Sequence, residues 1–160
     1  EALRANEEIS ERFIRDLHKI LMVEEHFVDA VTSEGRKTQK KIIPGEYKNE
    51  PNFVEIGGQR KFYSLPQDVV PKLHQLLQRY KLHRADGKDH GILVASIFHH
   101  HFTEIHPFDD GNGRLARLLL NYVLMQYSYP PIVLSVRDRE QYVEALSRNH
   151  VVEKVPPDGD

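Results

Sequence analysis

Residues 106–117 gather the residue types that phosphate chemistry uses. Gly111, Asn112 and Gly113 stand directly before a predicted helix. Glycines allow backbone N–H groups to turn toward one point, and the start of a helix adds unpaired N–H donors and the positive end of the helix dipole. This turn therefore predicts a binding site for an anion such as phosphate.

Charged and titratable side chains flank the turn. Arg114 and Arg117 lie three residues apart, hence on one helix face, where both can bind further phosphate oxygens. Asp110 offers a hard oxygen ligand, and Mg²⁺ typically takes one or two protein carboxylates and completes its coordination with water and phosphate. His106 is suited to take a proton from an alcohol near neutral pH. The set predicts a polyphosphate cradle with a metal ion and a general base.

Each of these parts also has an ordinary structural interpretation. A Gly-Asn-Gly turn before a helix is more often only a loop, arginines near a helix start are usually solvated, and a histidine before proline is usually a cap or a core residue. Here all of them fall within twelve residues, in the order that a mechanism needs. That combination favours the functional interpretation over separate coincidences.

The elements that must position these residues are mostly helical. Ser10 is suited to cap a first helix, Pro66 fits the start of a second, Pro107 ends a third, Pro130 follows a fourth, and Asp138 could cap a last one. The fourth is apolar on most of its circumference, which predicts a central, buried helix. We therefore expect an all-α domain of five or more helices. The apolar stripes are Phe13, Ile14, Leu17, Ile20 and Leu21; Val69, Leu73, Leu76, Leu77 and Tyr80; Leu93, Ile97, Phe98, Phe102 and Ile105; Leu115, Leu118, Leu119, Tyr122 and Leu124; and Tyr142, Val143 and Leu146.

Residues 35–65 have a different pattern, rich in Gly, Pro, Asn and Lys. Two β-prone runs, 53–56 and 60–63, flank a double glycine and predict one small hairpin. A lone hairpin is marginal in water, so it must pack on the helices or wait for a strand from a partner. We expect Lys37, Lys40 and Lys41 to lie in a solvated loop.

Composition narrows the class of protein. The 160 residues predict one domain with a core at about 9–150, and 22 basic against 24 acidic residues give a net charge of -2. Without a basic field, neither nucleic acid nor a membrane surface is expected as a partner. No cysteine, membrane-length apolar run or signal peptide is present, which favours a cytoplasmic protein. The chain starts without methionine, so a fragment of a longer chain stays an open alternative.

The sequence from His106 to Arg117 resembles the Fic (filamentation induced by cyclic AMP) family. The family motif is H-x-F-x-[D/E]-G-N-[G/K]-R-x-x-R, and the chain matches every specified position. Residues 10–22 resemble the first core helix, 52–65 the family's flap hairpin, and 138–149 the helix beside the adenine pocket. The resemblance thus covers about residues 9–149.

The resemblance implies transfer of AMP from ATP to a Ser, Thr or Tyr hydroxyl of a target protein. By motif position, His106 would be the general base and Asp110 would hold Mg²⁺. The backbone N–H groups of Gly111, Asn112 and Gly113 would bind the α- and β-phosphates, with the Asn112 side chain helping at the α-phosphate. Arg114 would contact the β- and γ-phosphates and Arg117 the γ-phosphate. Tyr142 and Asn149 resemble residues that line the adenine site.

The resemblance also implies how a target would dock. In family members the flap holds the target segment by strand addition, and here Phe53, Val54, Glu55 and Ile56, or the run 60–63, would offer the edge. An edge hairpin without a partner stays open as an equal alternative. The oligomeric state is not indicated.

Three functional alternatives remain open. Gly113 favours nucleotide transfer, because members that phosphorylate their targets carry lysine there. The domain could still use another donor such as UTP, CDP-choline or GTP, or remove AMP. It could also be a nucleotide-binding module without transfer activity, although an inactive descendant would be expected to lose His106 or Asp110.

Two further features have weaker predictions. Many Fic proteins restrain themselves through [S/T]-x-x-x-E-[G/N]; Glu34 and Gly35 resemble its end, but Ala30 breaks the motif, so we expect the chain as printed to be unrestrained. His99, His100 and His101 suggest a metal cluster, yet successive helix residues point 100° apart and cannot converge on one ion. We expect His99, two turns before His106, to be a packed, hydrogen-bonded neighbour of the site.

Overall fold

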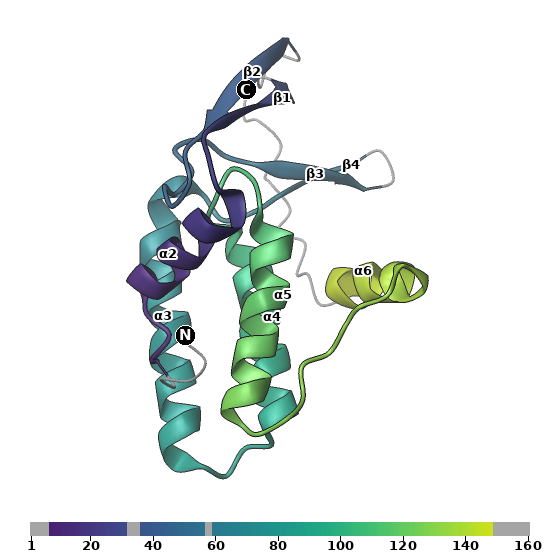
Figure 1. Cartoon of the computed structure of the whole chain (residues 1–160). Coiled ribbons are helices and arrows are strands. Elements are labelled where there is room, and N and C mark those ends of the chain that lie inside the picture. Colours follow the sequence, from purple (N-terminus) through teal and green to yellow (C-terminus); the bar gives the residue numbers. More distant parts are fainter. Residues whose placement is uncertain (1–6, 32–35, 57–58, 149–160) are drawn as a thin grey trace, which may run out of the picture.

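The computed structural model describes residues 7–31, 36–56 and 59–148, and within them the chain is mainly helical (Figure 1). Five α-helices, four strands and one 3-10 turn follow one another in this part of the chain, which confirms the predicted fold class. Their order is α2 (Glu11–Met22), β1 (His26–Val31), β2 (Lys37–Ile42), β3 (Phe53–Ile56), β4 (Gln59–Phe62), α3 (Pro66–Asp86), α4 (Gly91–Ile105), α5 (Asn112–Gln126), η1 (Val136–Asp138) and α6 (Arg139–Arg148).

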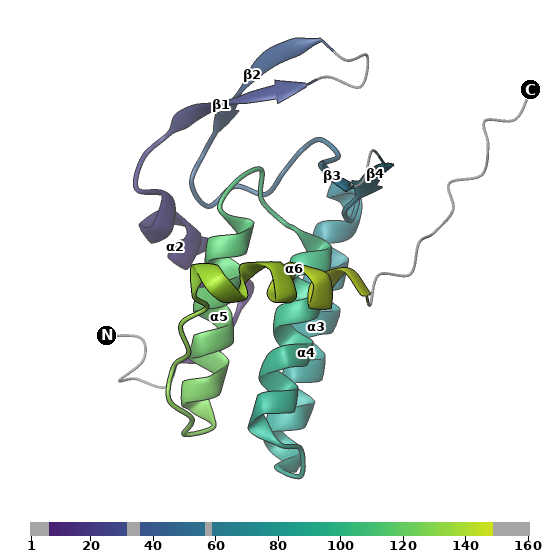
Figure 2. The same ribbon diagram turned by 90° about the vertical axis from the view of Figure 1, so that its right-hand side faces the viewer.

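The core lies between α3, α4 and α5, which run side by side (Figures 1 and 2). Phe98 and Phe102 of α4 and Leu115 and Leu119 of α5 are almost fully buried. The predicted central helix is thus confirmed: α5 buries side chains around most of its circumference. Burying a Leu or Phe side chain contributes roughly 1.5–3 kcal/mol, so this stack anchors the ends of α4 and α5.

Helix α2 crosses one end of this bundle and is capped as expected. The Ser10 hydroxyl accepts a hydrogen bond from the Phe13 N–H at 3.1 Å. The predicted inward position of Ile20 is wrong, since that side chain is 75% exposed, while His18 is fully buried. Apolar spacing alone cannot show that this helix buries a polar ring.

The assigned inward faces of three other helices also need correction. Leu93 of α4, Leu118 of α5 and Val143 of α6 are 52%, 46% and 48% exposed. The helices exist where predicted, but part of the apolar stripe of each faces outward. The last helix begins at Arg139, directly after the expected cap residue, and Asp138 itself ends the 3-10 turn η1.

Two hairpins, not one, stand at the same end of the bundle (Figure 1). The predicted hairpin is confirmed as β3 and β4, paired antiparallel with Phe53 opposite Phe62. The second hairpin pairs β1 with β2 and places Lys37, Lys40 and Lys41 on a strand. The expected solvated loop is therefore wrong. The second hairpin could not be predicted, because β2 lacks the apolar alternation that marks a half-buried strand.

No helix in the described ranges is both long and apolar enough to cross a membrane.

Candidate functional site

The motif loop, residues 106–111, joins α4 to α5 at the end of the bundle that carries both hairpins (Figure 1). Gly111 ends it in a left-handed conformation, with φ 76°, and α5 begins at Asn112. A Cβ at Gly111 would be strained at this φ and would lie 2.6 Å from the Met22 Sδ, so a side chain there is unfavourable. The first backbone N–H groups of α5 have no acceptor within their own helix, which leaves donors suited to an anion.

The Asn112 side chain braces this loop from inside. Its Oδ1 accepts from the Phe108 N–H at 2.9 Å, and its Nδ2 donates to the Phe108 carbonyl at 2.7 Å. The Asn112 residue is only 3% exposed, and the Phe108 ring is fully buried. These bonds give the side chain a structural task that the sequence analysis did not foresee.

Asp110 lies at the open side of the loop, with its side chain 39% exposed. Its Oδ1 accepts from the Gly111 N–H at 2.6 Å, which fixes the carboxylate at the start of α5. Its Oδ2 lies 3.4 Å from the Arg114 guanidinium and 3.4 Å from Nε2 of His26, which comes from the β1–β2 hairpin. A partly exposed carboxylate beside free N–H donors fits Mg²⁺, because this ion uses few protein ligands and takes phosphate oxygens for the rest.

His18 supports Asp110 from below and was missed by the sequence analysis. Its Nδ1 accepts from the Gly45 N–H at 2.8 Å, so Nε2 carries the proton and donates to the Asp110 carbonyl at 3.0 Å. The ring stacks on Phe108 with centroids 3.8 Å apart. Burial lowers the pKa of His18, in keeping with a neutral ring. A histidine inside an apolar stripe was the only signal that could have revealed this contact.

His106 lies at the C-terminal cap of α4 in a left-handed conformation, with φ 49° and ψ 61°. Its Nδ1 lies 3.3 Å from the Thr103 carbonyl, which can only accept, so Nδ1 carries the proton and Nε2 has a free lone pair. Its ring stacks on Tyr63, just after β4, with centroids 3.7 Å apart. Burial, with a smaller contribution from the Lys48 charge, lowers the pKa of His106 to about 4. The ring is therefore a neutral proton acceptor at physiological pH.

The two motif arginines face different neighbours. Arg114 is half-exposed beside Asp110, and its guanidinium also lies 3.5 Å from the Met22 Sδ. Arg117 interacts electrostatically with Tyr142 of α6, whose pKa is raised mainly by burial. Two arginines three residues apart thus point toward the start of α5 and toward α6.

Helix α6 lies across α4 and α5 (Figure 2) and is joined to them by a polar contact. The His99 Nδ1 donates to the Ala116 carbonyl at 3.0 Å, so its Nε2 accepts from the Tyr142 hydroxyl at 2.8 Å. His99 is 5% exposed, which confirms it as a packed, hydrogen-bonded residue. His100 and His101 instead contact Glu104, at 3.5 and 3.3 Å. Asn149, expected beside Tyr142, lies outside the described residues.

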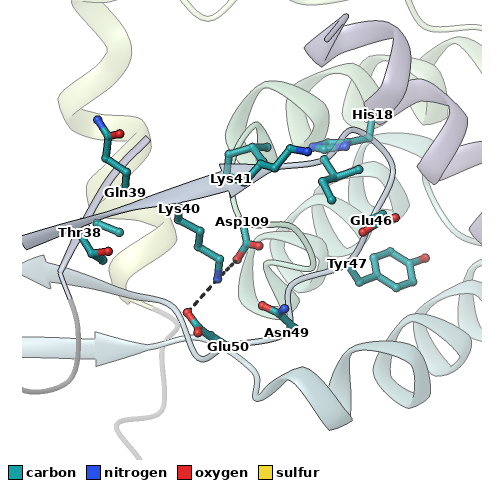
Figure 3. Close-up of a pocket in the computed structure, with 13 residues that line it drawn as sticks. His18, Thr38, Gln39, Lys40, Lys41, Glu46, Tyr47, Asn49, Glu50 and Asp109 are labelled. Carbon is teal, nitrogen blue, oxygen red and sulfur yellow. Dashed lines mark hydrogen bonds and ion pairs between the residues drawn. The ribbon is translucent and has the colours of Figure 1, made fainter. Parts of the chain in front are cut away.

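A cavity of about 440 Å³ lies on the other side of the motif loop, under β2 (Figure 3). Lys40 crosses it and bonds Asp109 at 2.8 Å and Glu50 at 3.2 Å. Burial alone would lower the pKa of Lys40, but these two carboxylates raise it. The residues expected to bind nucleotide do not line the cavity. Its lining is His18, Ala30, Thr38, Gln39, Lys40, Lys41, Ile42, Ile43, Glu46, Tyr47, Asn49, Glu50 and Asp109.

Comparison with known proteins identifies the family. The Fic/DOC family model matches residues 8–124, which is most of the chain. The chain belongs to the Fic/DOC family. This confirms the resemblance inferred from the motif, and the match includes the first helix, both hairpins and the motif helix.

Several relatives are similar over this region. A Fido domain-containing protein of Dictyostelium discoideum is 38% identical over 106 residues, which cover 66% of this chain and 71% of that protein. The protein adenylyltransferase Fic of Nematostella vectensis is 47% identical over 105 residues, covering 61% of this chain but 25% of that protein. The chain therefore spans only part of the adenylyltransferases that it matches.

Solved structures share the fold. A Fic-domain-containing signaling protein from Bacteroides thetaiotaomicron superposes with a TM-score of 0.76 and 33% identity, covering 92% of this chain and 50% of that one. Fic-1 of C. elegans gives a TM-score of 0.65 at 26% identity, covering 91% and 37%.

The Fic/DOC chain brings most of the expected site together at one end of α5. His106, Asp110, the turn 111–113 and Arg114 surround the start of that helix, and Tyr63 of the β3–β4 hairpin stacks on His106. Strand β3 spans the expected flap residues, with Phe53 and Val54 partly buried. The inhibitory candidates Glu34 and Gly35 lie outside the described residues.

Proposed function

We propose that this chain is the catalytic domain of a protein adenylyltransferase, which transfers AMP from ATP to a hydroxyl of a target protein. A relative that carries this name is 47% identical to it over 105 residues. The observation that carries the proposal is the state of His106, four residues before Asp110. Its ring is partly buried and neutral, its Nδ1 donates to the Thr103 carbonyl, and its Nε2 has no hydrogen-bond partner among the described residues. That is the arrangement a general base for an alcohol needs.

The reaction proceeds at the α-phosphorus of ATP. Nε2 of His106 accepts the proton of the target hydroxyl while the hydroxyl oxygen attacks the α-phosphorus. The bond from that phosphorus to its bridging oxygen breaks, and pyrophosphate leaves. Because such a transfer needs little covalent help, positioning and fixed positive charge supply most of the rate enhancement.

The phosphates lie against the start of α5. The backbone N–H groups of Gly111, Asn112 and Gly113 bind the α- and β-phosphates, and Arg114 and Arg117 bind the outer ones. The half-exposed Arg114 guanidinium beside Asp110 supports this assignment. Asp110 would hold Mg²⁺, which would neutralise phosphate charge. The Asn112 amide is already bonded to Phe108, so its contribution is to hold the turn.

The remaining contacts select the adenine of ATP and the target protein. Tyr142, held against α4 by His99, lines the adenine site, and Asn149 is proposed beside it. The target segment adds as a strand to the β3–β4 hairpin, whose strands pair only with each other in the described sheet. Backbone pairing would then bring the target hydroxyl toward His106, on which Tyr63 of the same hairpin stacks.

Intact mass spectrometry tests the proposal. The chain is incubated with Mg²⁺ and ATP, UTP, GTP or CDP-choline, with and without candidate target proteins. A gain equal to AMP, seen only with ATP, supports the proposal, whereas a gain with another nucleotide reassigns the donor. A pre-modified target that loses AMP would indicate the reverse reaction, and no change with any donor would favour a binding module.

The variant His106→Ala examines the base directly. AMP transfer should fall by at least about 100-fold, since a positioned general base contributes 10²–10⁴-fold, while ATP still binds. His101→Ala is the matched control, because His101 lies on α4 and contacts Glu104 and the His100 ring in the described contacts. Equal transfer by both variants would contradict the assignment.

A further inference from the structure

Lys48 is buried directly behind His106, although it lies far from the motif in sequence. The residue is 3% exposed, in the segment between β2 and β3. Its backbone N–H donates to the Pro107 carbonyl at 2.9 Å, and its Nζ donates to the Ile105 carbonyl at 3.3 Å. One residue thus holds the carbonyl groups on both sides of His106.

Asn52 connects Lys48 to a further residue of the motif loop. The Lys48 Nζ also donates to the Asn52 Oδ1 at 2.7 Å, and the Asn52 Nδ2 donates to the Phe108 carbonyl at 3.1 Å. The carbonyls of residues 105, 107 and 108 are therefore all bonded from the segment 48–52. None of these bonds involves the nucleotide side of the loop.

The conformation of His106 needs such support. A non-glycine residue in the left-handed region costs roughly 1–2 kcal/mol and persists only where its surroundings enforce it. Ile105 is also the last residue of α4, where carbonyls lack helical partners and a cation is favourable. The lysine satisfies both needs at once.

A buried ammonium group is costly, which argues for a task beyond filling space. Burial, opposed by Asp109 and helped by the charges of Lys72 and Lys40, lowers the pKa of Lys48 to about 8. The charged groups that face His106 are Lys48 and Asp110, with opposite effects. The Lys48 charge therefore favours the neutral form of the His106 ring.

We propose that Lys48 is a positioning residue for His106: it fixes the left-handed turn from behind and so aims the imidazole at the acceptor hydroxyl. This inference rests on the proposed role of His106 as the base. It assigns to the segment between the two hairpins a part in catalysis without contact with either substrate.

The test compares Lys48→Met, which keeps the aliphatic stem but removes the donor and the charge, with Lys48→Arg, which keeps both. In Lys48→Met we expect kcat for AMP transfer to fall between about 10- and 100-fold, as for a base displaced by a fraction of an ångström to 1 Å, with the Kd for ATP within about twofold. Lys48→Arg should restore most of the loss. Lys72→Met is the control, because Lys72 is exposed and donates only to the Ser64 hydroxyl in the described contacts.

NMR of the His106 ring separates positioning from general destabilisation. In Lys48→Met the ring should shift its ¹⁵N resonances and titrate at a higher pH than in the wild type, whereas Lys72→Met should leave both unchanged. If Lys48→Met melts too low for study, it is replaced by Lys48→Gln, which removes the charge and shortens the side chain, so that the bond to the Ile105 carbonyl is lost. A folded variant with wild-type kcat, or a loss of kcat with an unaltered His106 ring, would overturn the inference.

Failure of the proposed function would look different. If His106→Ala transfers AMP normally, the base assignment falls, yet the NMR comparison still reports whether Lys48 orients the ring.

Discussion

The two sides of the motif loop are held by opposite means. On the His106 side, a neutral, partly buried ring stacks on Tyr63 and is backed by Lys48, and its Nδ1 donates to the Thr103 carbonyl. On the Asp110 side, the carboxylate and the Arg114 guanidinium are 39% and 50% exposed and only loosely paired. The contrast follows from the chemistry: proton transfer needs a dry, fixed acceptor, whereas phosphate and a cation need open charge.

The largest expected effect on nucleotide affinity concerns the open side. Asp110→Asn keeps an oxygen that can accept from the Gly111 N–H but removes the charge. The affinity for ATP with Mg²⁺ should fall between about 10- and 100-fold, because a charge-assisted contact contributes roughly 1.5–3 kcal/mol. Calorimetric titration with Mg²⁺ and with EDTA measures it.

The titration in EDTA is the control for the titration with Mg²⁺. In EDTA, the variant and the wild type should bind ATP about equally. A similar loss of affinity in EDTA would mean that Asp110 acts on the loop and not through a cation.

The lowered pKa of His106 should be visible in the pH dependence of kcat/KM. The His106 pKa of about 4 means that the base stays deprotonated as the pH falls from 7 to 5.5. A histidine with the ordinary pKa of about 6.5 would lose roughly tenfold over that range, whereas here kcat/KM should change by less than about twofold. An acid limb with a midpoint near 6.5 would show that the ring is not buried as described.

The same shift makes a prediction for stability with a definite sign. Between pH about 4 and 6.5 the unfolded chain binds a proton at His106 and the folded chain does not, so acidification through this window destabilises the fold. His106→Gln should flatten the pH dependence of the free energy of unfolding there. An unchanged slope would contradict the assignment.

The hydrogen bonds that Asn112 makes inside the motif loop can be compared with an equivalent, exposed pair made by Asn121. Asn112 bonds both the N–H and the carbonyl of Phe108 in a buried setting, and Asn121 does the same to Ile132 at an exposed one, at 2.8 and 2.9 Å. Asn112→Ala should lower the free energy of unfolding by about 1–3 kcal/mol, because it leaves the buried Phe108 N–H unpaired. The Phe108 carbonyl keeps its bond from Asn52. Asn121→Ala should cost about 1 kcal/mol or less, since water can replace the amide. Urea denaturation measures both, and equal losses would show that burial does not matter here.

The smallest effect is expected between the β1–β2 hairpin and the loop. Lys40 and Asp109 have side chains 21% and 16% exposed and lie 2.8 Å apart. A double-mutant cycle with Lys40→Met and Asp109→Asn should give a coupling of about 1 kcal/mol in urea denaturation. Zero coupling would mean that the hairpin is not tied to the loop by this pair.

Much of the fold could be predicted because it follows from local rules. The Ser10 cap, the prolines at 66 and 107 and the apolar spacing of α3 to α5 mark helix ends that the structure reproduces. The outward turn of Ile20 and Leu93 could not be predicted, because periodicity gives a stripe but not which part of it meets a neighbour. The β1–β2 hairpin was not predicted for a related reason. Its lysine-rich strand β2 has no alternating apolar pattern, and its pairing with β1 is a contact between residues distant in the sequence.

The sequence by itself determined the chemical inventory and its order: a base, a carboxylate, a glycine turn and two arginines, all within reach because they are neighbours along the chain. Only the tertiary structure decided their state. His106 is neutral because burial, helped by the Lys48 charge, lowers its pKa against the opposing effect of the bond to the Thr103 carbonyl. Asp110 is oriented because the His18 ring donates to its backbone carbonyl. Burial and hydrogen-bond partners set protonation and orientation, and these depend on segments that only folding brings together.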